Sequence, residues 1–119
     1  MMKKLLQLAS AVMLGAFVAA CERCDEMSRD EMVARAREAL SESAQQLGSF
    51  NDSGREFPAN EFLRLTDADL QPLVVLQGGE VEGSLVLFEV SRNDSEWELG
   101  VAFNDYCQVT SVSWRATPQ

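Results

Sequence analysis

The sequence predicts an α+β domain in which an N-terminal amphipathic helix packs on a four-stranded antiparallel meander sheet. A helical apolar period over residues 28–47 is followed, from residue 73 onward, by alternating apolar positions interrupted by three turn signals. A chain of 119 residues suits a single domain. We place that domain at residues 28–119.

The helix is expected to begin after Ser28 and to end at Leu47. Ser28 and Glu31 have the spacing of a capping box, in which the serine side chain accepts a hydrogen bond from the Glu31 amide. Gly48 suits a left-handed C-cap. The apolar positions form one stripe, which we expect to pack on the protein's own sheet. The polar face lacks the basic excess of a membrane-surface helix.

Residues 48–60 contain many turn-forming residues and no hydrophobic period, which predicts a long loop. Phe50 and Phe57 indicate that this loop wraps around the domain. Thr66 and Asp69 have the spacing of a second helix cap, which would open a short helical turn.

Four strands are expected, at residues 73–77, 81–91, 96–103 and 106–115. A four-residue loop at 92–95 pairs Val90 with Trp97, and a two-residue turn at 104–105 pairs Phe103 with Tyr106. Directly paired residues share a face, so one face is predicted to carry the helix. Its members are Val86, Phe88, Val90, Trp97, Leu99, Val101, Phe103, Tyr106 and Val112.

The opposite face is expected to be apolar at one end and acidic at the other. The apolar end would hold Leu85, Leu87, Ala102, Cys107 and Val109, and the polar end Glu89, Glu96, Glu98, Ser111 and Arg115. Leu85, Leu87 and Val109 form the candidate partner surface. The loop containing Phe50 and Phe57 could instead cover it. A bulge at Gly100 that shifts the register by one residue stays open.

Residues 1–20 have the features of an export signal peptide. Two lysines precede an apolar run that is short for a membrane span. The sequence Val18-Ala19-Ala20-Cys21 resembles the lipobox of bacterial lipoproteins, and the resemblance covers residues 1–21 only. It implies cleavage before Cys21, a diacylglyceryl group on the Cys21 thiol and an acyl chain such as palmitate on the new N-terminus. An ordinary signal peptide is the alternative.

The same resemblance implies a location. Residues 21–27 would be a lipidated tether, and two or three acyl chains would anchor it firmly where one binds only marginally. In Gram-negative lipoproteins, aspartate after the lipidated cysteine favours retention in the inner membrane. This chain has Glu22 there, so we expect the periplasmic face of the outer membrane.

Two cysteines remain after Cys21 is assigned to the lipid. Cys24 and Cys107 can pair in an oxidising periplasm, which would join the head of the domain to its last strand. The alternative is a reactive thiol. The chain has no histidine to activate one, although an arginine or a helix N-terminus can do so.

The mature chain would be strongly acidic. Loss of the two signal-peptide lysines changes the formal net charge from −9 to −11, which disfavours nucleic acid as a partner and suits a basic protein. Without histidine there is no Ser-His-Asp triad and no histidine metal ligand. Glu96 and Glu98 suit the solvated face of a strand better than a glycosidase pair. No enzyme activity, metal site or cofactor is predicted.

These features predict a small membrane-anchored periplasmic lipoprotein that acts as a non-catalytic protein-binding or envelope accessory module. The alternative is a periplasmic inhibitor or immunity protein against a basic hydrolase or toxin, whose charge an acidic surface would complement. A small-ligand carrier or minor enzyme would need an apolar cavity. The order of one helix and four antiparallel strands resembles the cystatin-like arrangement, which hosts unrelated functions.

Overall fold

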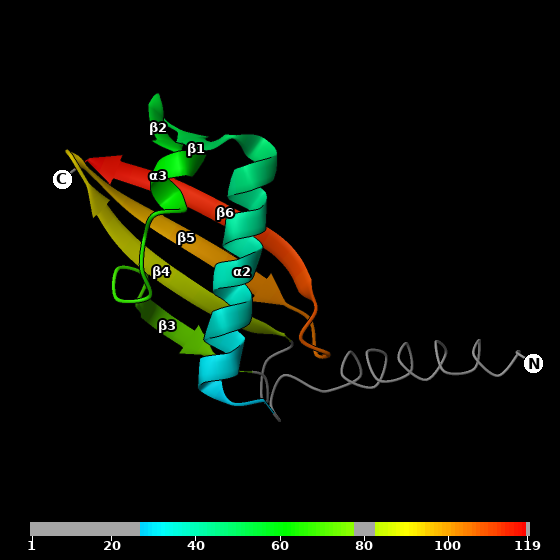
Figure 1. Cartoon of the computed structure of the whole chain (residues 1–119). Coiled ribbons are helices and arrows are strands. Elements are labelled where there is room, and N and C mark those ends of the chain that lie inside the picture. The colour runs from blue at the N-terminus through cyan, green and yellow to red at the C-terminus, as the bar shows by residue number, and fades with distance from the viewer. Residues whose placement is uncertain (1–26, 78–82, 119) are drawn as a thin grey trace, which may run out of the picture.

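The computed structural model describes residues 27–77 and 83–118 (Figure 1). The elements are α2 (Arg29–Leu47), β1 (Ser49–Asp52), β2 (Arg55–Pro58), α3 (Ala59–Phe62), β3 (Pro72–Leu76), β4 (Ser84–Arg92), β5 (Ser95–Phe103) and β6 (Val109–Pro118). The α+β class is confirmed: α2 packs on an antiparallel sheet of order β3-β4-β5-β6, and β1 and β2 form a second, smaller sheet. Because α2 begins at residue 29, it is not at the N-terminus of the chain.

Helix α2 has the predicted caps and the predicted apolar stripe. The Ser28 hydroxyl accepts a hydrogen bond from the Glu31 amide at 3.1 Å. Gly48 adopts a left-handed conformation, with φ of 83°, and its N–H donates to the Ala44 carbonyl at 2.8 Å. Glycine is favoured there because it has no Cβ to clash. The buried stripe consists of Met32, Val33, Ala36, Leu40 and Ala44.

The predicted pairing of β4 with β5 is confirmed. Val90 is opposite Trp97, and both side chains are buried on the face that α2 covers. The pairing continues to Arg92 and Ser95, so the predicted four-residue loop is a two-residue turn with one extra strand pair.

The predicted pairing of β5 with β6 is wrong. Phe103 is opposite Val109, and a bulge follows. The cause is a longer turn, in which the Asn104 side-chain oxygen accepts hydrogen bonds from the Tyr106 amide at 2.9 Å and the Gln108 amide at 3.0 Å. Tyr106 is therefore exposed and not in the core. Beyond the bulge, Val112 faces α2 as predicted.

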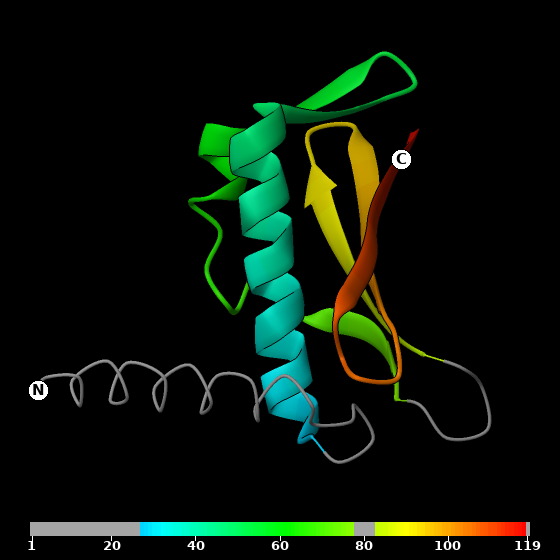
Figure 2. The same cartoon turned by 90° about the vertical axis from the view of Figure 1, so that its right-hand side faces the viewer.

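The segment predicted as a loop forms the β1–β2 hairpin. Its turn is Ser53-Gly54, with φ of 55° and 76°, and it aligns Phe50 with Phe57. Both rings are buried on the helix side of the sheet, in a cluster of edge-on and tilted contacts. Phe50 lies 5.0 Å from Trp114 and Phe57 lies 5.6 Å from Trp97 between ring centroids. The hairpin thus wraps around the domain but does not cover the opposite face (Figure 2).

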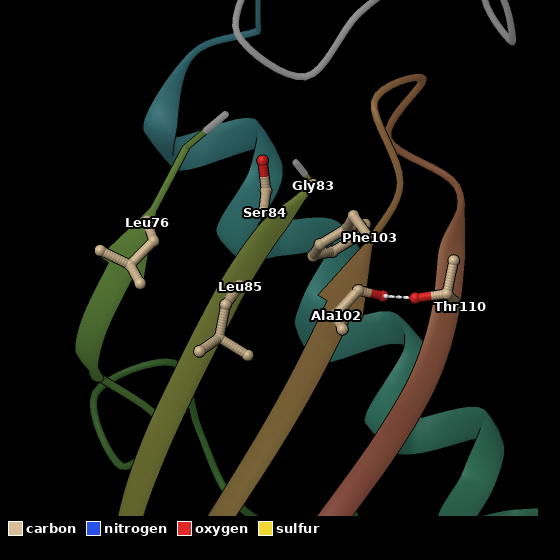
Figure 3. Close-up of a pocket in the computed structure, with 7 residues that line it drawn as sticks. All are labelled: Leu76, Gly83, Ser84, Leu85, Ala102, Phe103 and Thr110. Carbon is tan, nitrogen blue, oxygen red and sulfur yellow. Dashed lines mark hydrogen bonds between the residues drawn. The ribbon is translucent and has the colours of Figure 1, made fainter. Parts of the chain in front are cut away.

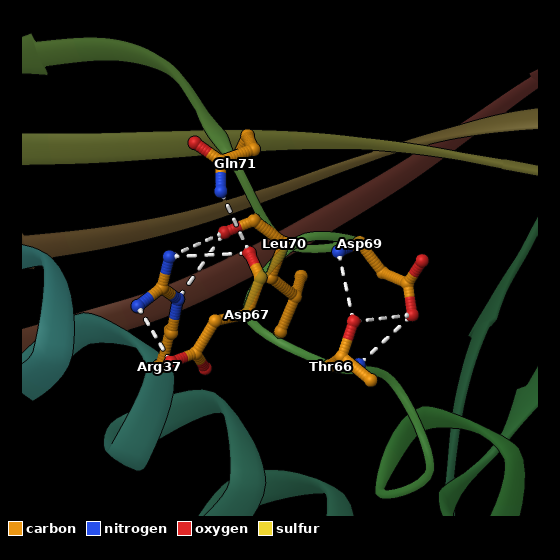
Figure 4. Close-up of polar contacts among 6 residues, drawn as sticks. All are labelled: Arg37, Thr66, Asp67, Asp69, Leu70 and Gln71. Atoms are coloured by element: carbon orange, nitrogen blue, oxygen red, sulfur yellow. Dashed lines mark hydrogen bonds and ion pairs between the residues drawn. The ribbon is translucent and has the colours of Figure 1, made fainter.

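Arg37 of α2 holds the connection between α3 and β3 (Figure 4). Its guanidinium donates to the Leu70 carbonyl at 2.9 and 3.2 Å and lies 3.7 Å from the Asp67 carboxylate. The predicted cap is also present, since the Asp69 carboxylate accepts from the Thr66 amide at 2.8 Å. This connection leaves β3 as the edge strand beside β4.

Candidate functional site

We call the sheet face directed away from α2 the outer face. Both described helices lie on the other side of the sheet, so neither covers it (Figure 2). Cross-strand pairs arrange the outer face in four rows. From one end to the other, the rows are Leu76–Leu85–Ala102–Ser111, Val74–Leu87–Gly100–Ser113, Glu89–Glu98–Arg115 and Ser91–Glu96–Thr117. The first two rows form the apolar half and the last two form the acidic half.

The apolar half has a flat centre at Gly100. A Cβ atom built there would lie 3.0 Å from the Ser113 hydroxyl, 3.4 Å from a Leu87 methyl group and 3.9 Å from a Leu85 methyl group. Leucine side chains from β4 therefore lean over the glycine and bury it. Leu76 at the margin is 50% exposed. This half therefore presents packed leucine side chains that solvent still reaches.

A shallow cavity of about 420 Å³ lies at the end of the apolar half. Figure 3 shows Leu76, Leu85, Ala102 and Thr110 around it, with α2 behind the sheet. The Thr110 hydroxyl donates to the Ala102 carbonyl at 3.2 Å. Gly83, Ser84 and Phe103 complete the lining. With aliphatic walls and no charged side chain in the lining, the cavity suits an apolar group.

The acidic half carries three carboxylates and one guanidinium. Arg115 forms an ion pair with Glu98 at 2.6 Å, and the Ser91 hydroxyl donates to Glu96 at 2.9 Å. Glu89 is exposed. The local charge is therefore negative, so this half favours a basic partner.

The structure brings Leu85 and Leu87 together but places Val109 elsewhere. Val109 lines a separate cavity of about 400 Å³ beside α2, with Arg35, Glu38, Ala39, Glu42 and Cys107. The β6 bulge is the cause, because one additional residue reverses the side on which the preceding residues lie. The candidate partner surface thus loses Val109. A bulge was foreseen as an alternative, but at Gly100.

Cys107 is also on the helix side, so its predicted place on the opposite face is wrong. It is 2% exposed, belongs to the core and is disulfide-bonded. Cys21 and Cys24, the other cysteines of the chain, lie outside the described residues. Lipidation of Cys21 and pairing of Cys24 with Cys107 therefore stay predictions. The signal peptide at 1–20 also lies outside the described residues.

Two residues of the outer face were missed by the sequence prediction. Val74 and Leu76 join the apolar half because β3 pairs Val74 with Leu87 and Leu76 with Leu85. The strand itself was predicted, and alternation along it would have placed these residues on one face. No register with the next strand was predicted for it; in the structure Val74, Val75 and Leu76 pair in turn with Leu87, Val86 and Leu85.

One titratable group outside this face has a shifted pKa. The Ser95 hydroxyl and then the Arg55 guanidinium, 3.1 Å away, hold the pKa of Asp94 below its usual value. This contact joins the β1–β2 hairpin to the β4–β5 turn, and the Ser95 hydroxyl also accepts from Arg55 at 2.8 Å, an arrangement typical of a structural ion pair.

Within residues 27–77 and 83–118, no group of three or more acidic or cysteine side chains could hold a metal ion. Within the same ranges no helix is long and apolar enough to cross a membrane. Comparison of the chain with protein-family models, curated proteins and solved structures finds no match. The outer face is therefore the candidate functional site.

Proposed function

We propose that the chain is a small lipid-anchored lipoprotein of the cell envelope that binds another protein through its outer face. The lipobox-like sequence at residues 18–21 supports the anchor, with Cys21 as the lipidated residue. The observation that carries the binding role is the apolar half of the outer face. It groups Leu85 and Leu87, with Leu76 at the margin, on a surface that neither described helix covers.

The form of this surface favours a protein partner. Side chains from three strands make a nearly continuous apolar area, and such an area flanked by polar residues is typical of a protein interaction site. The acidic half adds charge, which steers and orients a basic partner. A non-catalytic accessory role needs no more than this surface and the anchor.

A second function is favoured by the acidic half alone. Glu89, Glu96 and Glu98 face the same side, where Arg115 forms an ion pair with Glu98. An inhibitor or immunity protein could use these carboxylates against the cationic surface of a hydrolase or toxin. The cystatin-like order of elements is compatible with both functions, because folds of this kind host unrelated activities.

Photo-cross-linking in cells would test the binding role. A photoreactive residue at Ser113, exposed on the edge strand β6 of the outer face beside Gly100, is compared with one at Glu42, exposed on α2. We expect Ser113 to give a discrete cross-linked protein that Leu85→Asp abolishes and Leu63→Asp retains. Leu63 is a suitable control because it is an exposed leucine outside the outer face.

A partner that both leucine variants retain, or the same partner at Glu42, would refute binding through the outer face. Circular dichroism of both variants shows whether each is folded. The anchor is tested separately by intact mass of the membrane-derived protein, which should begin at Cys21 and carry acyl mass.

A further inference from the structure

The described domain has two poles, and the chain enters at one of them. The Met27 carbonyl accepts a hydrogen bond from the Gln77 side chain at 3.0 Å, so the first described residue lies beyond the tip of β3. The Gly83 amide donates to Asp105 at 3.0 Å, which joins the start of β4 to the β5–β6 turn. We call this end the tether pole (Figures 1 and 2).

The other end, the distal pole, holds the β1–β2 hairpin, the β4–β5 turn and the end of β6 (Figure 2). Helix α2 connects the two poles. Its 19 residues give it a length of about 28 Å. The distal pole therefore lies roughly one helix length from the point at which the chain enters.

The length of the tether decides which pole can stay at a membrane. If Cys21 carries the lipid, six residue steps separate it from Met27, a reach of at most about 22 Å. A Cys24–Cys107 bridge would shorten this to three steps, about 11 Å, plus about 6 Å across the disulfide. Cys107 lies between Tyr106 and Gln108 in the turn of the tether pole. Either tether is shorter than α2.

The side chains of the tether pole suit a lipid surface. Leu76 and Tyr106 are large side chains that are 50% and 51% exposed. An aromatic ring with a polar end is favoured at the boundary between lipid and water. The acidic half of the outer face lies at the opposite end of the sheet, where its carboxylates avoid the cost of desolvation.

From this geometry we infer that the tether pole is a membrane-contact surface, with Leu76 and Tyr106 at the lipid–water boundary and the acidic half directed away from the bilayer. The inference rests on the proposed lipidation of Cys21. The expected surface is zwitterionic, because Asp30 and Asp105 at this pole are acidic and outnumber the neighbouring base, Arg29. The anchor would hold the domain at a high local concentration beside the bilayer. The tether pole itself therefore needs only weak affinity for lipid.

Quenching by bromine-labelled lipid tests the orientation. The lipidated protein is placed in phosphatidylcholine vesicles with brominated acyl chains, as the wild type and as the variants Leu76→Trp and Leu47→Trp. Leu47 is a matched control because it is 55% exposed and ends α2 at the distal pole. We expect Leu76→Trp emission to fall on bromination, while the Leu47→Trp and wild-type emissions stay unchanged.

Each result of the quenching experiment either supports or overturns the proposed membrane orientation. Loss of emission in Leu76→Trp alone supports the inference. Equal loss in both variants, or loss in neither, overturns the orientation while the anchor stands. Intact mass of the same sample distinguishes failure of the lipid anchor from failure of the orientation. If the protein carries no acyl mass, the proposed lipidation of Cys21 is wrong and this inference falls with it. Tyr106→Trp, expected to be quenched like Leu76→Trp, replaces that variant if it does not fold.

Discussion

Phe57 and Phe50 are buried aromatic side chains that join the β1–β2 hairpin to the main sheet, and replacing Phe57 by alanine removes the first of these contacts. Phe57 is 1% exposed. Its ring lies 5.6 Å from that of Trp97 and 5.7 Å from that of Phe62, between centroids. The Arg92 guanidinium lies over the same ring, 4.4 Å from its centroid. The same arginine also forms an ion pair with Glu61, so the ring lies between the core and a charged contact.

The expected loss in the free energy of unfolding is about 4 kcal/mol, since phenylalanine-to-alanine changes in cores cost about 3–5 kcal/mol. Phe57→Leu keeps most of the volume and loses the ring contacts. It should cost about 1–2 kcal/mol, because each aromatic pair is worth about 0.5–1.5 kcal/mol. Leu63→Ala, at an exposed leucine, should change stability by less than about 0.5 kcal/mol.

Urea unfolding of the mature chain, followed by circular dichroism, measures all three variants. The denaturation midpoint should be highest for Leu63→Ala, lower for Phe57→Leu and lowest for Phe57→Ala. The slope of the unfolding free energy against urea concentration should stay unchanged. If Phe57→Ala cost no more than Leu63→Ala, Phe57 would not pack on Trp97 and Phe62 as described and the reasoning would be refuted. Should Phe57→Ala not fold, Phe57→Leu against Leu63→Ala makes the same comparison.

Three further predictions concern local contacts. Gly83→Ala should destabilise by more than about 2 kcal/mol, because its Cβ would lie 2.5 Å from a carbonyl oxygen at φ of 80°. Gly54→Ala, at a φ of 76° with no atom within 4 Å, should cost only about 1 kcal/mol, and thermal unfolding compares the two. Arg37→Ala should cost about 1–2 kcal/mol in urea unfolding through its lost hydrogen bonds. Arg35→Ala, which breaks an exposed ion pair, should cost under about 0.5 kcal/mol. The Asp94 pKa is lowered in the folded state, so its stabilisation is present above the usual pKa and is lost as pH falls through the folded value. Asp94→Asn should remove that part of the acid dependence, and an NMR titration of the Asp94 carboxyl group would show the lowered pKa directly.

The elements that could be predicted from the sequence are those whose signals are local. Helix α2 has its own start and stop residues, Ser28 and Gly48, and an apolar stripe long enough to set its period. The β4–β5 pairing follows from nine-residue strands with strict alternation. Any one-residue slip would have moved Phe88 and Trp97 from the core to solvent.

The β5–β6 register could not be obtained in that way. It depends on Asn104, whose side-chain oxygen accepts two backbone N–H groups and lengthens the turn. Alternation along β6 shows which residues share a face, but it does not show how many residues form the turn between β5 and β6. Val112 was therefore placed on the correct side, whereas Cys107 and Val109, which precede the bulge, were not.

The hairpin was missed for a different reason. Strands β1 and β2 have four residues each, too few for an alternating pattern, and their turn places Ser53 at a positive φ that this residue type rarely adopts. Phe50 and Phe57 are held by contacts with Trp97 and Trp114, about forty to sixty positions later in the chain. Tertiary packing therefore decides this element.

The proposed binding face and the proposed membrane contact together constrain the partner. Along β4, Leu85 and Glu89 are separated by about 13 Å, and Leu85 lies in the row nearest the tether pole. A protein that covers the apolar half must therefore approach the bilayer closely. A soluble basic hydrolase needs only the acidic half, which points away from the membrane. The partner cross-linked at Ser113 is thus expected in the membrane fraction for an accessory role and to depend on Leu85. A partner in the soluble fraction that depends on Glu89 and Glu96, and tolerates Leu85→Asp, would instead favour the inhibitor role.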